Sequence, residues 1–317
     1  MSRHVFMDEE LSPTLREAET PQPGEGQVRV RVIRAGVNFW EIMQRRGRVP
    51  VPDHRVPGSE GVGVVEAPAG GAGGLVPGQR VAWSKVPGSY ADVVVAPASA
   101  FVPVPDAVSD AVAAALLFQG ATAHYLCHDA WQVNEGDTAV VTAAAGGVGV
   151  LLTQLLVARG ARVIGVVSTP EKAHVGFRAG ATHMVTYSDS MAEEIRANAP
   201  GGVAVVYDSV GSGVAEPLLG VLRARGAMVL YGAASGREAD IRAGNLGGGS
   251  LFLTRTAGRD YFGDAQQAAR RSSLLLDLAA QGVLNPVIGG EFPLTDVASV
   301  WDALESRSTV GKLLLVP

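Results

Sequence analysis

The sequence has the composition of an ordinary folded chain. It contains 317 residues, of which 47% are hydrophobic and 18% charged, and its formal net charge is −5. This length is enough for two domains, and the composition argues against disorder. The mild acidic balance gives no electrostatic basis for nucleic acid or an anionic membrane as the main partner.

Cysteine content and the N-terminal residues bear on the compartment. The single cysteine, Cys127, excludes an internal disulfide and a cysteine cluster for zinc. The first residues lack the layout of a secretory signal, so we expect a cytoplasmic chain. Residues 139–158 are nearly uncharged and about as long as a membrane is thick, but the AAAGGVG break within them favours a strand, a turn and a helix. We therefore expect no membrane segment.

The first third of the chain is predicted to be rich in β-strands. Val28, Val30 and Val32 alternate with arginines, which is the period-two pattern of a half-buried strand. Further apolar runs follow at 61–66, 80–83 and 90–96, separated by clusters of glycine and proline. Short strands with turns between them predict a compact, barrel-like domain.

From Asp110 onward the pattern predicts a different architecture. A helix over 110–130 is followed by apolar strands without polar alternation, and helices separate these strands, as in a parallel sheet covered on both faces. The predicted strands are 138–143, 162–167, 183–187, 203–208 and 227–231, and the predicted helices between them are 148–159, 171–179, 193–199 and 215–223. This indicates a doubly wound α/β nucleotide-binding domain. The tail adds a strand at 250–255, helices at 264–281 and 296–306, and a final strand at 312–316.

The segment AAAGGVG lies between the first of these strands and the first of these helices. Aligned on the pattern G-x-G-x-x-G, its special positions are Ala144, Gly146 and Gly149. Small residues there allow a sharp turn and a close approach of a diphosphate, with helix N–H groups aimed at the anion. A strand–helix turn without a ligand has the same pattern, but the surrounding series of strands and helices favours a dinucleotide.

The end of the next strand indicates which dinucleotide is bound. NAD sites usually place an acidic residue there, about 20 residues beyond the glycine motif. This chain instead has Ser168 and Thr169, followed by Lys172. Ser168 can donate to a phosphate, Lys172 offers a positive charge, and Tyr187 at the end of the third strand is placed to reach the same group. These residues favour NADPH over NADH, with Glu171 interpreted as a solvent-facing acid.

Several segments together resemble a known family. VNFWEIMQRRG, PGSEGVG, AAAGGVG, VVYDSVG, GSLFLTRT and ESRSTVGKLLLVP occur in this order along the chain. They resemble the zinc-free quinone oxidoreductase (zeta-crystallin-like) branch of the medium-chain dehydrogenase/reductases. The resemblance implies a GroES-like, β-rich catalytic domain over 1–117 and 259–317 and a Rossmann NADPH-binding domain over 118–258. It also implies a homodimer that pairs the 250–255 strand across a two-fold axis.

The resemblance also assigns roles to individual positions. The residues that match cofactor contacts of the family are Asn38, Phe39, Met43, Thr122, Tyr125, Gly146, Gly147, Val148, Gly149, Ser168, Thr169, Lys172, Tyr187, Ser209, Tyr231, Gly232, Ala233, Leu253, Thr254, Arg255 and Arg307. The predicted substrate pocket contains Trp40, Met43 and Gln119. No catalytic acid is evident. Asn38, Thr122 and Tyr125 are candidates for orienting the substrate, with plain structural hydrogen bonding as the alternative for each.

Departures from the family pattern are informative. Zinc-dependent relatives have a cysteine where Asn38 lies and a GHE motif where Gly58-Ser59-Glu60 lies, so no metal is expected. Met43 and approximately Val49 replace two pocket tyrosines of quinone reductases. Gln119 stands in place of a lysine, and Ala233 in place of an asparagine. The pocket is therefore less aromatic than in those relatives, which leaves the quinone itself open.

The expected chemistry is the reduction of an electron-poor acceptor, because no zinc polarises an alcohol for oxidation. The nicotinamide carries the hydride, and the protein supplies position and water exclusion. Three functions stay open: reduction of a quinone, reduction of an enone or enoyl thioester in a biosynthetic pathway, and a non-catalytic NADPH-binding role. The acidic balance and the missing basic stripe count against nucleic acid. The expected partner is a small electrophilic molecule.

Overall fold

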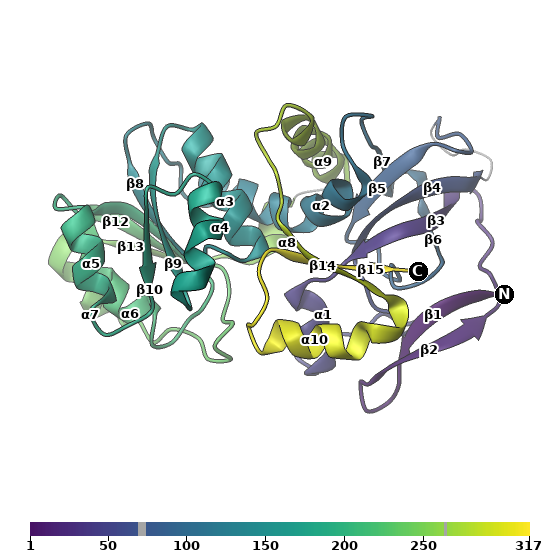
Figure 1. Cartoon of the computed structure of the whole chain (residues 1–317), viewed down its shortest axis with the longest axis horizontal. Coiled ribbons are helices and arrows are strands. Elements are labelled where there is room, and N and C mark those ends of the chain that lie inside the picture. The colour runs from purple at the N-terminus through teal and green to yellow at the C-terminus, as the bar shows by residue number, and fades with distance from the viewer. Residues whose placement is uncertain (69–73, 263–264) are drawn as a thin grey trace. The chain divides into compact units, whose positions relative to one another are not determined.

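The computed structural model describes residues 1–68, 74–262 and 265–317. The backbone forms two compact units, which Figure 1 labels by element. Unit 1 comprises Met1–Ala121 and Gly263–Pro317, and unit 2 comprises Thr122–Phe262. In agreement with the sequence, unit 1 is rich in antiparallel strands and unit 2 is a parallel α/β unit.

Unit 2 is built on a six-stranded sheet in the order β10-β9-β8-β11-β12-β13, and every adjacent pair is parallel. Its strands are β8 (Thr138–Thr142), β9 (Arg162–Val167), β10 (His183–Thr186), β11 (Val203–Asp208), β12 (Leu222–Leu230) and β13 (Phe252–Arg255). The first strand of the series, β8, lies between the second and the fourth, so the strand order reverses there. The predicted doubly wound sheet is confirmed.

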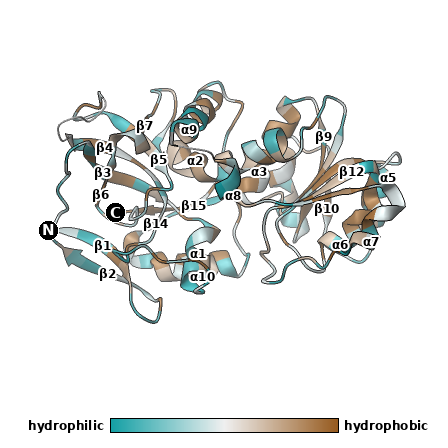
Figure 2. Cartoon of the chain, turned by 180° about the vertical axis from the view of Figure 1, so that it is seen from behind, coloured by the Kyte–Doolittle hydropathy of each residue, from teal (hydrophilic) through white to brown (hydrophobic). Residues whose placement is uncertain are grey.

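Helices cover both faces of this sheet. Figure 1 shows α3 (Gly147–Ala158) and α4 (Ala173–Arg178) on one face, with α5 (Met191–Asn198) and α6 (Ala215–Leu218) on the opposite face. Strands β8, β9 and β11 are almost wholly buried, and the sheet appears largely brown in Figure 2. The first residues of β12 and most of the edge strand β13 are exposed. The short helices α7 (Ala243–Leu246) and α8 (Gly258–Tyr261) flank β13 in the chain.

One predicted helix of unit 2 is wrong in its second half. The expected helix over 215–223 ends as α6 at Leu218 and a 3₁₀ turn over Leu219–Val221. Leu222 already belongs to β12, where it pairs with Val203 of β11. Tertiary pairing in the sheet therefore overrides the helical spacing of these residues.

Unit 1 contains a seven-stranded sheet and a separate hairpin. The sheet has the order β14-β15-β3-β4-β5-β7, with β6 also paired to β3, and the hairpin joins β1 to β2. These strands are β1 (Ser2–Met7), β2 (Pro13–Ala18), β3 (Gln27–Gly36), β4 (Glu60–Pro68), β5 (Arg80–Ser84), β6 (Val93–Pro97), β7 (Val102–Pro103), β14 (Ile288–Pro293) and β15 (Lys312–Val316). Val28, Val30 and Val32 of β3 are buried in the core, which confirms the period-two prediction.

The helices of unit 1 surround this sheet. They are α1 (Phe39–Arg45), α9 (Ala265–Ala280), α10 (Val297–Glu305) and the first part of α2 (Asp110–Tyr125), which continues as a π-helical turn over Leu126–Ala130. The predicted helix over 110–130 is thus confirmed, and the start predicted for α9 at residue 264 lies outside the described residues. The strands β1, β2, β7 and β14 were not predicted. No helix in the described ranges is both long and apolar enough to cross a membrane.

Candidate active site

The glycine turn follows β8 at the point where the strand order reverses. Ala143 adopts a left-handed conformation with φ 49°, and Gly146 is the N-cap residue of α3. A Cβ atom on Gly149 would lie 2.4 Å from the carbonyl oxygen of Ala143, so a side chain at this position would collide with the backbone of the turn. No side chain caps the N-terminus of α3. The first N–H groups of this helix are therefore available to an anion.

Side chains from two neighbouring strands fix this turn from behind. The hydroxyl of Thr142 donates to Asp208 at 2.8 Å, and the other carboxylate oxygen accepts the N–H of Gly211 at 2.7 Å. Thr142 also accepts the N–H of Ser209 at 3.1 Å. Asp208 is fully buried, and burial raises its pKa above the ordinary range. Sequence reasoning missed this carboxylate, whose only cue was its position as the last residue of the apolar strand β11.

Tyr187 links the turn to the cluster predicted for the second phosphate. Its hydroxyl accepts the N–H of Ala143 at 2.8 Å, and its own N–H donates to the carbonyl of Val167 at 3.0 Å. The end of β10 therefore lies beside the end of β9, where Ser168 is exposed to solvent. The structure thus brings Tyr187, Ser168 and the glycine turn together.

Lys172 and Glu171 complete this edge of unit 2. The backbone N–H of Lys172 donates to the carbonyl of Thr169 in a 3₁₀ turn, so Lys172 follows the end of β9 closely. Partial burial lowers the pKa of Lys172. Glu171 is exposed, and a hydrogen bond from the Thr169 side chain lowers its pKa. The acid next to the cluster is therefore engaged by Thr169.

A second group of predicted cofactor residues lies past the ends of β11 and β12. The N–H of Tyr231 donates to the carbonyl of Asp208, and the N–H of Ala234 donates to the carbonyl of Ser209. A Cβ atom on Gly232 would lie 2.7 Å from that Ser209 oxygen, which explains a glycine here. The backbone therefore holds Ser209 next to residues 231–233.

The remaining predicted residues of unit 2 are Tyr125, Thr122 and residues 253–255. Tyr125 is buried, its hydroxyl lies 3.3 Å from that of Thr256, and its ring stacks on Tyr261 at 4.6 Å. In β13, Leu253 is partly exposed, Thr254 half-buried and Arg255 exposed. Thr122 is half-buried.

In unit 1, Asn38 belongs to a buried polar cluster. Its side-chain oxygen accepts from Lys312 Nζ at 2.6 Å, and its side-chain nitrogen donates to Glu60 at 3.3 Å. Its backbone N–H donates to Glu41 at 2.8 Å, and Ser59 donates to the same carboxylate at 2.5 Å. These five residues, each no more than 8% exposed, are called the Lys312 cluster below.

The donor set of this cluster does not fit zinc. Asn38 and Ser59 offer an amide and a hydroxyl, which are not the usual ligands of that metal. The Lys312 ammonium lies 2.5 Å from Glu60, and an ammonium group has no lone pair to offer a cation. Among the residues that the structure describes, no group of three His, Cys, Asp or Glu side chains could hold a metal ion.

The predicted substrate residues of unit 1 lie beside this cluster in the chain. Trp40 is 42% exposed, whereas Phe39 and Met43 on the same helix are half-buried. The side-chain oxygen of Gln119 is buried and has no hydrogen-bond partner among the described residues. Arg307, exposed and with φ 59°, follows α10.

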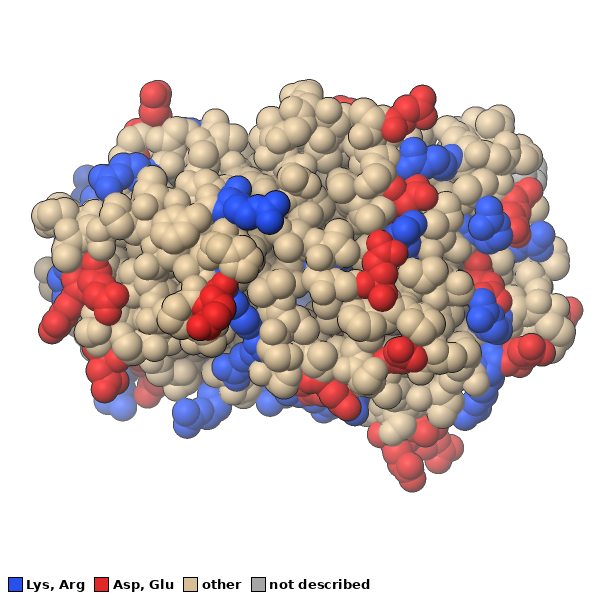
Figure 3. All heavy atoms as spheres, viewed as in Figure 1, with Lys and Arg blue, Asp and Glu red and all other residues tan. Residues whose placement is uncertain are grey.

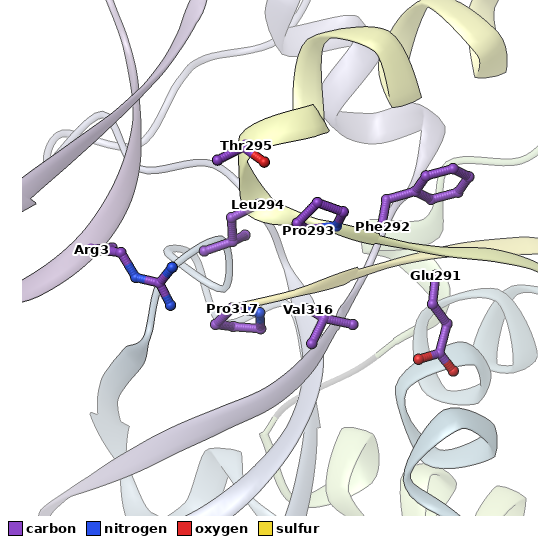
Figure 4. Close-up of a pocket in the computed structure, with 8 residues that line it drawn as sticks. All are labelled: Arg3, Glu291, Phe292, Pro293, Leu294, Thr295, Val316 and Pro317. Carbon is purple, nitrogen blue, oxygen red and sulfur yellow. The ribbon is translucent and has the colours of Figure 1, made fainter.

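A separate cavity of about 350 Å³ opens at the end of β14 in unit 1. Figure 4 shows the residues that line it, which are Arg3, Glu291, Phe292, Pro293, Leu294, Thr295, Val316 and Pro317. Its charged members are paired elsewhere, Arg3 with Asp92 and Glu291 with Arg34. The cavity contains none of the predicted site residues.

The sheet order and the turn define a Rossmann-type α/β protein that carries a second, β-rich unit. Two family models match the chain: the alcohol dehydrogenase GroES-like domain over residues 24–106 and the zinc-binding dehydrogenase domain over residues 147–273. The first match falls in unit 1, and the second begins at the start of α3.

Relatives match over nearly the full length. A 2-haloacrylate reductase of a Burkholderia species is 37% identical, with 95% of this chain and 94% of the relative covered. A quinone oxidoreductase of Pseudomonas aeruginosa is 34% identical with the same coverage. The crystal structure of Escherichia coli quinone oxidoreductase complexed with NADPH has a TM-score of 0.92 and 31% identity, and both chains are covered completely. The chain belongs to the quinone oxidoreductase branch of the medium-chain dehydrogenase/reductases.

Proposed function

We propose that this protein is an NADPH-dependent oxidoreductase that reduces a quinone by hydride transfer without zinc. The observation that carries the proposal is the uncapped N-terminus of α3 at the strand-order reversal, next to the group formed by Ser168, Lys172 and Tyr187. NADPH-complexed and quinone-reducing relatives of the same fold support it.

Each residue group has its own part in this proposal. NADPH supplies the hydride when it is bound. The N–H groups of the first turn of α3 hold the diphosphate, and Lys172 and Ser168 bind the 2′-phosphate. Residues 231–233 and Ser209 support the nicotinamide half, as do Thr122 and residues 253–255. Phe39, Trp40 and Met43 exclude water from the acceptor, and Gln119 offers it an amide.

A second candidate activity is the reduction of an activated carbon–carbon double bond. The observation that favours it is the 37% identity to a 2-haloacrylate reductase, since a 2-haloacrylate carries an activated carbon–carbon double bond. The less aromatic pocket, with Met43 and Val49 where quinone reductases have tyrosines, points in the same direction. Both activities need the same cofactor site, so they differ only in the acceptor.

The remaining parts of the proposal concern domains and partners. We assign residues 1–117 and 259–317 to the catalytic domain and 118–258 to the NADPH-binding domain. We also assign a cytoplasmic location and a homodimer that pairs β13 across a two-fold axis. The exposed apolar side chain of Phe252 on this edge strand supports the dimer. Nucleic acid is not proposed as a partner, because basic and acidic side chains are interspersed on the face shown in Figure 3.

The decisive assay follows the oxidation of NADPH by absorbance with two acceptor panels, one of small quinones and one of enones and 2-haloacrylates. We expect turnover with at least one panel and a preference for NADPH over NADH. Turnover confined to the alkene panel would replace the quinone by the second candidate. Tight NADPH binding without turnover in either panel would support a non-catalytic role instead.

A further inference from the structure

The Lys312 cluster contains an ion pair between residues 252 positions apart in the chain, Glu60 and Lys312. Both side chains are inaccessible to solvent, and their charged atoms lie 2.5 Å apart. A buried pair of this kind contributes little net stability, because the cost of removing both charges from water offsets their attraction. Its retention in the core of unit 1 therefore needs another physical reason.

The carboxylate of Glu60 divides its two oxygens between different segments. One oxygen accepts from Lys312 and Asn38, and the other accepts the backbone N–H of Phe118 at 2.6 Å. The pair thus connects β15 and β4 to Asn38, which precedes α1, and to Phe118 in the middle of α2. Asn38 begins the segment 38–43, which contains Trp40 and Met43, and Phe118 begins the segment 118–121, which contains Gln119. These two segments hold the predicted substrate residues of unit 1.

Backbone atoms of β3 and α2 lie close to the ion pair. A Cβ atom on Gly36 would lie 2.6 Å from Glu60, 2.7 Å from Lys312 and 2.6 Å from the carbonyl oxygen of Ala114 in α2. Gly36 is also the residue of β3 that pairs with Leu314 of β15. The pair is therefore packed directly against the backbone of a strand and a helix.

We propose that the Glu60–Lys312 ion pair is a positioning element that sets residues 38–43 and 118–121 in the geometry required for turnover. Neither side chain contacts solvent, so their influence reaches the acceptor through Asn38 and Phe118. The effect on catalysis rests on the proposed function, whereas the effect on local structure does not.

The test uses three variants of the full-length protein: Lys312→Met, Glu60→Gln and the double variant. For each single variant we expect kcat/KM for the acceptor to fall by about tenfold to a hundredfold, since misplaced pocket segments lose alignment. The dissociation constant for NADPH should change less than kcat/KM, since the predicted diphosphate and 2′-phosphate contacts lie in unit 2 and only Asn38, Phe39, Met43 and Arg307 of the predicted cofactor contacts lie in unit 1. The double variant should recover part of the loss, because it leaves no unpaired buried charge.

Hydrogen exchange supplies a readout that does not depend on activity. We expect faster amide exchange in residues 39–45 and 118–121 of Lys312→Met, with unchanged exchange in β8 and α3. The matched control is Arg3→Gln, which removes the solvent-exposed Arg3–Asp92 pair of the same unit and should alter neither readout. If Lys312→Met does not fold, Glu60→Gln, which removes the charge and keeps the shape of the side chain, is used in its place for the exchange experiment.

The outcomes separate the two proposals. Unchanged exchange in both segments would overturn the positioning role, whatever the activity. Faster exchange with unchanged kcat/KM would also overturn it, and would leave the pair a purely structural feature. If the unaltered protein oxidises no NADPH with any acceptor, the proposed function fails, and the exchange experiment alone then decides whether the pair orders these segments.

Discussion

The glycine turn of unit 2 and the Lys312 cluster of unit 1 are both polar sites within apolar surroundings, but the sequence encodes them differently. The turn is made by consecutive residues, 143–149, and its spacing, within a series of alternating strands and helices, predicts a dinucleotide. The cluster joins Asn38 to Lys312, which are 274 positions apart. A site made of consecutive residues can be recognised from the spacing of those residues in the sequence. A buried network of residues far apart in the sequence can be recognised only from the folded structure.

The largest predicted effect concerns Glu41 of the Lys312 cluster. Burial raises the pKa of Glu41 to about 7 from 4.5, against the opposing effects of the Ser59 hydrogen bond and the Lys312 charge. The folded state therefore binds more protons than the unfolded state between pH 4.5 and about 7. The resulting stabilisation is fully present below this window and is lost as the pH rises through it, by roughly 3 kcal/mol.

Denaturant unfolding across this pH range checks the prediction for Glu41. Glu41→Gln has no titrating side chain at this position and should lack this component of the pH dependence. The difference in unfolding free energy between the unaltered protein and Glu41→Gln should therefore change by roughly 3 kcal/mol between pH 4.5 and about 7. Parallel pH profiles would show that Glu41 stays ionised in the folded protein.

The next effect is expected at the glycine turn. Gly149→Ala places a methyl group against the carbonyl oxygen of Ala143, and overpacking of this kind costs about 1–3 kcal/mol. Because the strained atoms belong to the turn itself, we expect NADPH binding to weaken by about tenfold to a hundredfold in a fluorescence titration. Gly201→Ala is the matched control, since a Cβ atom on Gly201 meets nothing within 4 Å. Equal affinities of the two variants would mean that the turn does not contact the cofactor.

Lys172→Ala should produce an effect of similar size that is selective for one cofactor. The variant loses a charge-assisted contact to the 2′-phosphate, which is worth about 1.5–3 kcal/mol. We therefore expect the Michaelis constant for NADPH to rise by about tenfold or more while that for NADH changes little. Equal changes for both cofactors would refute the assignment of Lys172 to the second phosphate.

Tyr187→Phe sharpens the comparison with Lys172. The Tyr187 hydroxyl holds the N–H of Ala143 in the turn that both cofactors would use. Losing this hydrogen bond, worth about 0.5–1.5 kcal/mol, should weaken NADH and NADPH by a similar factor of about two to ten. Weakening of NADPH alone would assign the hydroxyl to the 2′-phosphate rather than to the support of the turn.

Burial of the side chains determines which strands could be predicted from the sequence. Strands β8, β9 and β11 were predicted because nearly all of their side chains are buried and apolar. β9, β11 and β15 have the predicted bounds. β2 and β14 were missed because their residues are only partly buried, so no apolar run marks them. Helix α6 was predicted too long because the pairing of Leu222 with Val203 is a tertiary effect.

The residues of the candidate site likewise fall into those that the sequence predicts and those that it does not. The turn, Ser168, Lys172 and Tyr187 could be predicted because their spacing or their place at a strand end has a chemical meaning. Lys312 resembled the ordinary start of a strand, and Glu60 was noticed only because its motif lacks the histidine of zinc-dependent relatives. Asp208 gave no signal that it supports the turn, because its partner Thr142 lies in another strand.

All the functional assignments depend on NADPH binding at the turn after β8 and its neighbours. Calorimetric titration of the purified protein with NADPH and with NADH measures this binding. We predict saturable binding of one NADPH per chain, with NADH binding at least about tenfold more weakly, the worth of one charged contact. Absence of NADPH binding, or equal affinity for the two cofactors, would contradict the account.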